Sequence, residues 1–324
     1  MICAQSNPYR YTQPIEDPDH FVGRSTQLAH CQEIIGKRGC LSMVGGPGSG
    51  LTSLLKRLLG ADIRQACSVE GERLLILYLD CTQLSDPCAL IHVLLSHLAP
   101  EKSSQNVTRW QDAFRQLIRT MDDWGQDGRL VLLLDDFEAI GANEKYIEFL
   151  DRFRGLTNYA QMTLITATHT ELRFCCHMSI VESPFPNMFS VDHLAAFTGG
   201  EALELMVRAS QASGVGLVPY ATDILALSGG MLYLLQMACW RYHQAICDQE
   251  PLDRQAVEAF MLAEARPMLE RIWQSLDAQE CEALRLLSQG ATPEKMGANL
   301  VRRGYSDGSG ICSTVLAAYV AGMG

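Results

Sequence analysis

The stretch that decides the fold is Cys40-Leu-Ser-Met-Val-Gly-Gly-Pro-Gly-Ser-Gly-Leu-Thr-Ser-Leu-Leu55. A short, mostly apolar run leads into a glycine-rich turn, and a helical pattern begins at Leu51, as in a phosphate-binding loop that joins a strand to a helix. Gly45, Gly50 and Thr52 take the places of the two glycines and the hydroxyl residue in G-x-x-x-x-G-K-[ST], but the lysine position holds Leu51. The spacing therefore predicts a phosphate-binding loop without its one full positive charge.

The missing lysine sets what this loop can do. In an intact loop the backbone N–H groups, the helix dipole and the lysine together hold the phosphates, and the glycines let the ligand approach the backbone. A unit charge about 4 Å away contributes at most roughly 4 kcal/mol, or about three decades of affinity. We therefore expect weak or absent binding of ATP. The contacts of this loop with a nucleotide would come from Gly45, Gly46, Pro47, Gly48, Ser49, Gly50, Leu51, Thr52 and Ser53.

Composition limits the class of protein. The chain has 324 residues, enough for two or three small domains, and its 48% hydrophobic and 19% charged residues are ordinary for a globular protein in solution. No apolar run reaches the roughly 18 residues of a membrane span, and the first residues do not form a signal peptide. We expect a cytoplasmic protein with no membrane partner. The net charge of −11 disfavours a main role in binding nucleic acid, although it does not exclude a local basic patch.

The 12 cysteines are scattered and none lies in a C-x-x-C pair. The one dense patch, Cys175-Cys176-His177, lacks a second pair of ligands at zinc spacing. Reduced, mostly buried thiols are the simpler interpretation.

Changes of texture divide the chain into four parts. Residues 1–20 are polar and punctuated by prolines, which indicates an extended arm, whereas residues 21–192 alternate apolar strands with helices, which predicts a parallel sheet covered by helices. Residues 193–275 are helical and would form a lid. Residues 276–324 show three helical segments and a glycine turn, which resemble a winged helix. The predicted fold class is therefore α/β, a P-loop NTPase sheet followed by a helical lid and a winged-helix domain.

A second apolar strand, Leu130–Leu134, ends in Asp135 and Asp136. Such a strand can present one aspartate to Mg²⁺, together with the hydroxyl of Thr52, and a second carboxylate to a water. Asp136 is one methylene shorter than the usual glutamate, so as a catalytic base it reaches less far toward a water. Thr168 ends a later strand and could sense the γ-phosphate. The simpler alternative is a buried parallel strand followed by turn residues.

Taken together, residues 5–324 resemble the AAA+/STAND class of bacterial P-loop ATPases. The matching motifs are Asn7-Pro8 with Phe21-Val22-Gly23-Arg24, Gly45–Thr52, Leu130–Asp136, Thr168-His169 and Leu227–Gln236. The resemblance assigns Gly23 and Arg24 to the segment around adenine and Gly230 to the lid motif. It implies ATP and Mg²⁺ as cofactors and a protein partner or self-assembly, because proteins of this class act as protein-interaction machines.

The departures from the class gather at the nucleotide positions. Leu51 replaces the lysine, Asp136 the glutamate and His169 an arginine, while Met231-Leu232 replaces the His-Pro of the lid motif. Lys56 lies about 140° around the helix from Leu51, so we expect it to point away from the loop.

Three functions remain open on the sequence. The first is a pseudo-ATPase that keeps the fold as an assembly or signalling scaffold. The second is a working ATPase that receives a cation from elsewhere, such as a neighbouring subunit. The third is a DNA-binding AAA+ regulator, and only the basic pair Arg302-Arg303 supports it in the sequence. Because unmet N–H donors are costly when buried, we expect the loop to be filled or closed, with the lid in contact near Gly230 and Met231.

Overall fold

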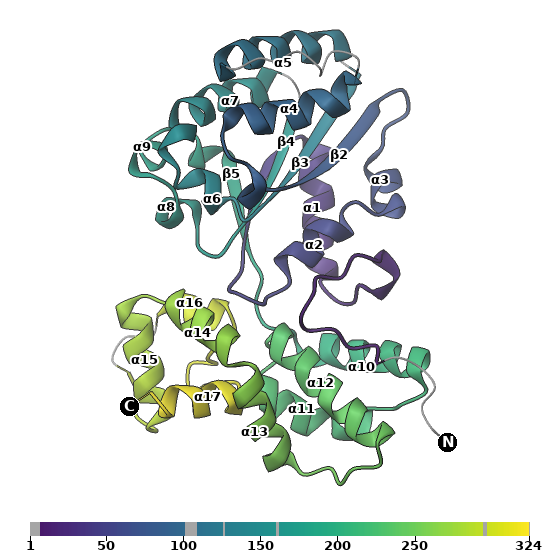
Figure 1. Ribbon diagram of the computed structural model, residues 1–324, viewed down its shortest axis with the longest axis vertical. Helices are drawn as coiled ribbons and strands as arrows, with labels where there is room; N and C mark the ends of the chain where they lie inside the picture. The colour runs from purple at the N-terminus through teal and green to yellow at the C-terminus, as the bar shows by residue number, and fades with distance from the viewer. Residues whose placement is uncertain (1–6, 101–108, 126, 160–161, 294–296, 324) are drawn as a thin grey trace. The chain divides into compact units, whose positions relative to one another are not determined.

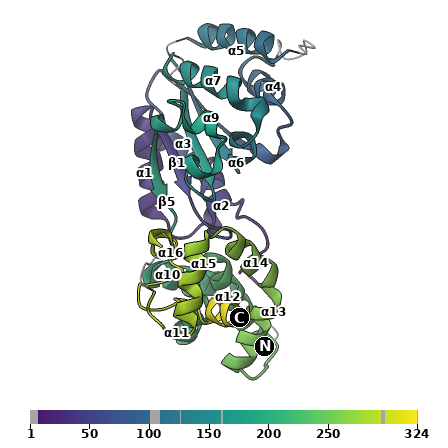
Figure 2. The ribbon, with the colours of Figure 1, turned by 90° about the vertical axis from the view of Figure 1, so that its left-hand side faces the viewer.

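The structure is a computed structural model that describes residues 7–100, 109–125, 127–159, 162–293 and 297–323. Its internal contacts divide the chain into two compact units (Figures 1 and 2). The sheet unit comprises Thr26–Val44 and Leu54–Asp192, and the helical unit comprises Met1–Ser25, Gly45–Ser53 and His193–Gly324. The glycine-rich loop thus belongs to the helical unit by its contacts, although the chain enters and leaves it through the sheet unit.

A five-stranded sheet with the order β2-β3-β4-β1-β5 forms the centre of the sheet unit. The strands are β1 (Cys40–Val44), β2 (Arg73–Asp80), β3 (Gly128–Asp135), β4 (Met162–Thr168) and β5 (Phe189–His193). The pairs β2–β3, β3–β4 and β1–β4 are parallel. Strands β3 and β4 are buried along their whole length, as expected for near-continuous apolar runs in a parallel sheet covered on both faces. The predicted α/β class is confirmed.

Helices cover the sheet because its apolar side chains need partners on both faces. Those of the sheet unit are α1 (Ser25–Lys37), α3 (Ala61–Cys67), α4 (Pro87–Leu98), α5 (Trp110–Trp124), α6 (Glu138–Gly141), α7 (Ile147–Tyr159), α8 (Leu172–Cys175) and α9 (Met178–Val181). Side chains of α4, α5 and α7 form one buried cluster with those of β2, β3 and β4. In Figures 1 and 2, α1 lies on the other face of the sheet from α4 and α7. Helix α2 (Leu51–Arg57) follows the glycine-rich loop.

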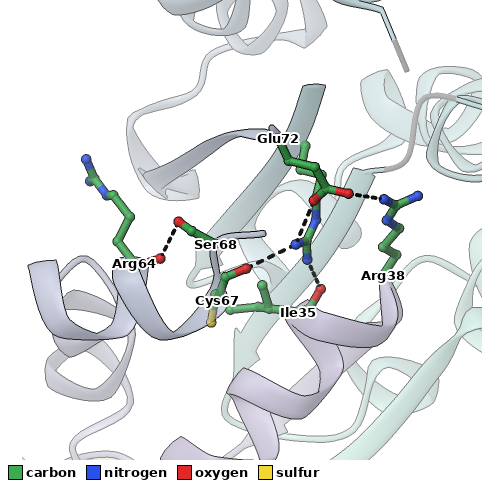
Figure 3. Close-up of polar contacts among 7 residues, drawn as sticks. Ile35, Arg38, Arg64, Cys67, Ser68 and Glu72 are labelled. Atoms are coloured by element: carbon green, nitrogen blue, oxygen red, sulfur yellow. Dashed lines mark hydrogen bonds and ion pairs between the residues drawn. The ribbon is translucent and has the colours of Figure 1, made fainter. Parts of the chain in front are cut away.

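A buried arginine joins several elements where β2 and β3 begin. Arg129 is 3% exposed and donates hydrogen bonds to the carbonyl oxygen of Cys67 at 3.1 Å, to Glu72 Oε2 at 3.1 Å and to the carbonyl oxygen of Ile35. Arg38 donates to the other oxygen of Glu72 at 2.6 Å. Figure 3 shows Ile35, Cys67, Glu72 and Arg38 around this network. A buried charge with this many partners fixes the ends of α1 and α3 against the sheet.

The helical unit contains eight α-helices in its described residues after the sheet. They are α10 (Gly199–Ser213), α11 (Ala221–Ser228), α12 (Leu232–Cys247), α13 (Arg254–Glu264), α14 (Arg266–Gln274), α15 (Ala278–Ser288), α16 (Ala298–Arg302) and α17 (Thr314–Ala321). Buried side chains from the predicted lid and from residues after 276 share one core cluster. The boundary at 276 and the winged helix remain predictions. Residues 294–296 of the expected helix at 293–303 lie outside the described residues.

The first twenty residues have little regular structure where they are described. Residues 7–20 contain one 3₁₀ turn, Pro18–His20, and residues 1–6 of the predicted arm lie outside the described part. Asn7 holds the arm against α12, because its side-chain amide donates to the carbonyl oxygen of Trp240 at 2.9 Å. Among the helices in the described ranges, none has both the length and the apolar character needed to cross a membrane.

Candidate functional site: a glycine-rich loop and an acidic strand end

The glycine-rich loop has the local structure that its sequence predicts. It follows the fully buried strand β1 and opens α2, and the N–H of Ser49 closes a turn onto the carbonyl oxygen of Gly46 at 3.1 Å. Gly48 and Gly50 have φ angles of 74° and 92°, which residues other than glycine rarely adopt. The loop therefore needs its glycines for its own conformation.

Side chains of the helical unit cover this loop. A methyl group at Gly46 would lie 2.0 Å from the hydroxyl oxygen of Tyr305, and one at Gly50 would lie 2.6 Å from Cδ2 of Leu232. A methyl group at Gly48 would lie 2.8 Å from Cβ of Tyr233. The lid motif at 227–236 thus reaches the loop directly, and a residue far along the chain, Tyr305, joins it. The expectation of a covered loop holds for the face that the loop shares with the helical unit.

The covering tyrosine is neutral. Tyr305 is 3% exposed, and burial raises its pKa to about 12 in spite of the nearby guanidinium of Arg303, which acts in the opposite direction. The phenol therefore brings no negative charge against the loop at ordinary pH.

Little space is left along the covered face. One cavity, lined by Gly46–Ser49 together with Leu232, Tyr233 and Tyr305, has a volume of about 20 Å³. A second, lined by Gly50, Ser53, Arg24, Phe197 and Leu232, is also about 20 Å³. That is the space of a single water, so neither cavity can take a triphosphate or an adenine ring. The side chains of the helical unit therefore fill this face of the loop closely.

Leu51, which stands at the lysine position, is turned into the protein. It is 7% exposed, and its Cγ lies 3.2 Å from where a methyl group on Gly45 would stand. The hydroxyl of Ser53 is engaged within the protein, because it accepts a hydrogen bond from the N–H of Ile15 in the arm at 3.1 Å. Thr52 is half-buried. The isobutyl group therefore packs where a lysine would extend toward phosphate.

An arginine lies on the loop, although the sequence assigned it only to the adenine segment. Arg24 is 4% exposed and its guanidinium donates to the carbonyl oxygen of Ser49 at 3.2 Å, 4.8 Å above the ring of Phe197. Gly23 and Arg24 both have positive φ angles, 73° and 59°. The N–H of Arg24 donates to Glu201 Oε1 at 2.9 Å. This kinked segment ties the loop to the start of α10.

Gly230 lets the lid motif close on the segment before α10. It has a φ of 74°, and a methyl group there would lie 2.3 Å from the carbonyl oxygen of Phe197. The N–H of Phe197 donates to the carbonyl oxygen of Gly230 at 2.8 Å. The glycine that the sequence placed at the cofactor is thus needed for backbone packing.

In the sheet unit, the acidic strand end is polar and held by hydrogen bonds. Asp135 is 4% exposed; it accepts hydrogen bonds from the hydroxyl of Tyr78 at 2.7 Å and from the N–H of Asp136 at 3.2 Å. The register pairs Asp80 with Asp135, so the ends of β2 and β3 bring their acids to the same edge. Both oxygens of the predicted magnesium ligand are therefore engaged by protein donors.

Asp136 occupies a strained and partly buried position. Its φ is 47°, and burial, followed by the charges of Asp135 and Glu138, raises its pKa above the ordinary value. Ligand atoms of Asp136, Glu138 and His169 lie within 4.8 Å of one another, and the N–H of His169 donates to Glu138 Oε1 at 3.2 Å. The sequence did not single out Glu138. Its signal was an acid three residues after the end of the strand.

Two other predicted features are buried or engaged. Thr168, the expected γ-phosphate sensor, is 1% exposed, and its hydroxyl has no hydrogen-bond partner among the described residues. Lys56 lies in the sheet unit with its ammonium 5.7 Å from the centre of the Tyr78 ring.

The basic pair Arg302-Arg303 does not form an open patch. Arg303 is 7% exposed and its guanidinium lies 3.4 Å from both the carbonyl oxygen and the hydroxyl of Ser275. Arg302 is exposed at the end of α16. Of the two arginines, only Arg302 is exposed to solvent.

Comparison with known families places these observations. A model of the family Novel STAND NTPase 2 matches residues 119–293, more than half of the 324 residues, and a model of the AAA domain family matches residues 34–175. No curated protein matches the chain.

Several solved structures share the fold. The Walker-type ATPase of Pyrococcus abyssi is 15% identical with a TM-score of 0.62, over 95% of this chain and 98% of that protein. The ORC2 protein of Aeropyrum pernix, in ADPNP–ADP complexes, is 14% identical with a TM-score of 0.60, over 94% and 84%. The ORC1 protein of Aeropyrum pernix, in complex with DNA, is 12% identical with a TM-score of 0.56, over 83% and 72%. At these identities the likeness concerns the fold alone.

Proposed function

The chain belongs to the Novel STAND NTPase 2 family, and on that premise we propose that it is a scaffold for protein assembly or signalling whose loop binds nucleotide weakly or not at all. One observation carries the proposal: Leu232, Tyr233 and Tyr305 fill the space against Gly46, Gly48 and Gly50. These side chains already hold the glycine-rich loop against the helices, so no nucleotide is needed to bring the loop and the helices together. Its partner would be another protein or a second copy of the chain.

The charge at the loop supports the same proposal. Without a lysine, and with Leu51 buried, the loop lacks the cation that stabilises charge during phosphoryl transfer. Asp135 meets Tyr78 rather than an open site. ATP and Mg²⁺ would then act as weak ligands at most, and hydrolysis would stay at background.

Titration calorimetry of the full chain with Mg²⁺-ATP tests the proposal. We expect no saturable binding of the unchanged protein up to millimolar nucleotide. Leu51→Lys alone is expected to raise the ATP affinity by no more than tenfold, because Leu232 and Tyr305 still lie against the loop. The double variant Leu51→Lys with Leu232→Ala restores the charge and removes the side chain over Gly50, so its affinity is expected to rise by up to about three decades. Micromolar binding by the unchanged protein would contradict the proposal.

Phosphate release at high protein concentration tests hydrolysis separately. Background release, unchanged by Asp135→Ala, is expected. Steady release that Asp135→Ala abolishes would favour the working ATPase, and the buried Arg24 on the loop is the specific observation behind that second candidate. Arg24→Lys would then lower the rate, because a lysine keeps the charge but loses the planar fork.

A DNA-binding regulator is the third candidate, and its support is the fold shared with ORC1 of Aeropyrum pernix. The net charge of −11 and the burial of Arg303 argue against it. Duplex binding that weakens steeply with salt and is lost in Arg302→Ala would favour DNA. We expect no such binding at micromolar protein.

A further inference from the structure

Carboxylates gather at the edge of the sheet where β2 and β3 end. The register places Asp80 beside Asp135, and Asp136 and Glu138 follow directly along the chain. Within the described residues, no lysine or arginine forms an ion pair with any of these four side chains. Charges of one sign repel each other when they are held together away from water, so this edge of the sheet lacks a positive partner.

A histidine from the neighbouring strand completes a set of metal ligands. His169 directly follows β4, which pairs in parallel with β3, so the two strands end at the same edge. One ligand atom from each of Asp136, Glu138 and His169 lies within 4.8 Å of the other two, and all three side chains are half-buried. The three residues belong to the sheet unit. The group therefore combines an imidazole with two carboxylates and is more than a cluster of acids.

The carboxylate of Glu138 gives a second observation that points to a cation. Its Oε1 accepts a hydrogen bond from the N–H of His169 at 3.2 Å, whereas its Oε2 is buried and has no hydrogen-bond partner among the described residues. A buried carboxylate oxygen without a donor is costly, and proteins compensate such a charge with a basic side chain or a metal ion. Since no lysine or arginine of the described chain pairs with Glu138, a metal ion is the partner that fits.

The spacing of the three ligand atoms suits a transition-metal ion. Nitrogen and oxygen ligands lie about 2.0–2.2 Å from a tetrahedral zinc ion, so two of its ligand atoms are about 3.4 Å apart. The largest separation in the group would have to shrink by at most about 1.4 Å, which rotation of the side chains can provide. An imidazole with two carboxylates suits Zn²⁺, Co²⁺ or Mn²⁺, whereas Mg²⁺ prefers oxygen ligands and keeps several of its waters.

We propose that Asp136, Glu138 and His169 form a binding site for a divalent transition-metal ion, and that Zn²⁺ binds there more tightly than Co²⁺ or Mn²⁺. The site differs from the predicted Mg²⁺ position, because it uses neither Asp135 nor Thr52 and needs no nucleotide. The bound ion would hold the first turn of α6 to the end of β4, since its ligands come from these two segments.

Calorimetric titration of the full chain tests the site. The protein is first treated with a chelator, kept reduced and then titrated with ZnCl₂ in the absence of nucleotide. We expect saturable binding at micromolar Zn²⁺, and binding of MgCl₂ that is weaker by roughly tenfold or more, because Mg²⁺ gains little from an imidazole. Equal affinity for Mg²⁺, or Zn²⁺ binding that requires ATP, would overturn the proposal.

Conservative variants identify the ligands. Asp136→Asn, Glu138→Gln and His169→Gln each keep a similar size, and each is expected to weaken Zn²⁺ binding by roughly tenfold or more. Thermal unfolding without metal checks that each variant is folded. His177→Gln is the matched control, because it removes another half-buried histidine of the sheet unit, 3.9 Å from Glu144, and is expected to leave the affinity unchanged. Unchanged affinity in the three ligand variants, or its loss in His177→Gln, would contradict the proposed ligands.

Hydrogen exchange locates the bound ion. The N–H of His169 donates to Glu138, so the ion should protect this amide by holding the two segments together. At free Zn²⁺ about ten times its Kd, exchange of the His169 amide is expected to slow by about tenfold, because the ion binds only the closed form. The same Zn²⁺ concentration should have little effect in Glu138→Gln. Equal protection in Glu138→Gln, or no protection in the unchanged protein, would place the ion elsewhere and refute the site.

Discussion

The glycine-rich loop and the acidic strand end differ in how their polar groups are treated. Around the loop, the neighbouring side chains are apolar or neutral: Leu51 is buried at the lysine position, and Leu232 and Tyr305 lie against Gly50 and Gly46. At the strand end, carboxylates remain together and are held by named donors, such as the hydroxyl of Tyr78 on Asp135. The loop is therefore surrounded by uncharged side chains, whereas the strand end keeps a cluster of carboxylates.

The two units also reach stability by different means. The helical unit depends on close backbone approach, with glycines at positive φ under side chains and carbonyl groups. The sheet unit depends on a continuous apolar sheet and on one buried, fully partnered arginine. Variants that remove one device at a time can show whether the two units are independent in solution.

The largest effect is expected from Arg129→Ala in the sheet unit. It leaves Glu72 and the carbonyl oxygens of Ile35 and Cys67 without their shared donor, which should lower the free energy of unfolding by about 3–5 kcal/mol. Hydrogen exchange of the β3 amides, followed through urea, measures the loss. Arg38→Ala removes only the outer ion pair and should cost less than about 1 kcal/mol. Equal losses for both variants would show that burial does not govern this network.

A somewhat smaller loss is expected in the helical unit from Gly230→Ala. The left-handed backbone costs an alanine about 1–2 kcal/mol, and the 2.3 Å approach to Phe197 adds to that, so we expect about 2–3 kcal/mol. Gly214→Ala is the matched control, because Gly214 has a φ of 73° and nothing within 4 Å of the added methyl group. Thermal unfolding with exchange of the α12 amides compares them. If Gly214→Ala lowers the free energy of unfolding as much as Gly230→Ala does, the close approach of Gly230 to Phe197 does not contribute to the loss.

The helix cap beside the loop gives an effect of about 1 kcal/mol that depends on pH. Burial alone would raise the pKa of Glu201, but the N–H groups of Arg24 and Thr198 outweigh it and lower the pKa. The charged carboxylate thus stabilises the fold above the unfolded pKa of about 4.3, and this contribution is lost as the pH falls through the folded value. Glu201→Gln should be less stable than the unchanged protein by about 1 kcal/mol at pH 7. Urea unfolding from pH 7 to pH 3 should show the difference shrink at the acid end; a constant difference would contradict it.

The smallest effect, and of opposite sign, is expected at the acidic strand end. Burial and the charges of Asp135 and Glu138 raise the pKa of Asp136, so the folded state holds its proton longer than the unfolded chain. Stability at this group is therefore lost as the pH rises through the folded pKa. Asp136→Asn keeps the shape and tolerates the φ of 47°, and it should stabilise the sheet unit slightly at pH 7. The gain should vanish below the unfolded pKa of about 3.9, as urea unfolding at pH 3 can check.

Much of the fold follows from short stretches of sequence. The run before Gly45 predicts a buried strand because its side chains are apolar, and the glycine spacing predicts a turn into a helix at Leu51; both elements are present. The same reasoning predicts the end of a helix at Ser228-Gly229-Gly230, and α11 ends there. These signals are local, because strand and helix periods and turn chemistry act over a few residues.

What the sequence by itself determined is the α/β sheet, the glycine-rich loop without its lysine, and the acids at the end of β3. Only the tertiary structure decided that Tyr305 lies over Gly46, that Arg24 lies on the loop, that Tyr78 meets Asp135 and that Arg303 is buried. Each of these contacts joins residues far apart in the chain, and packing and desolvation across such distances leave no periodic mark in either segment. The local spacing therefore predicts the loop, but the packing of the helices decides which side chains cover it.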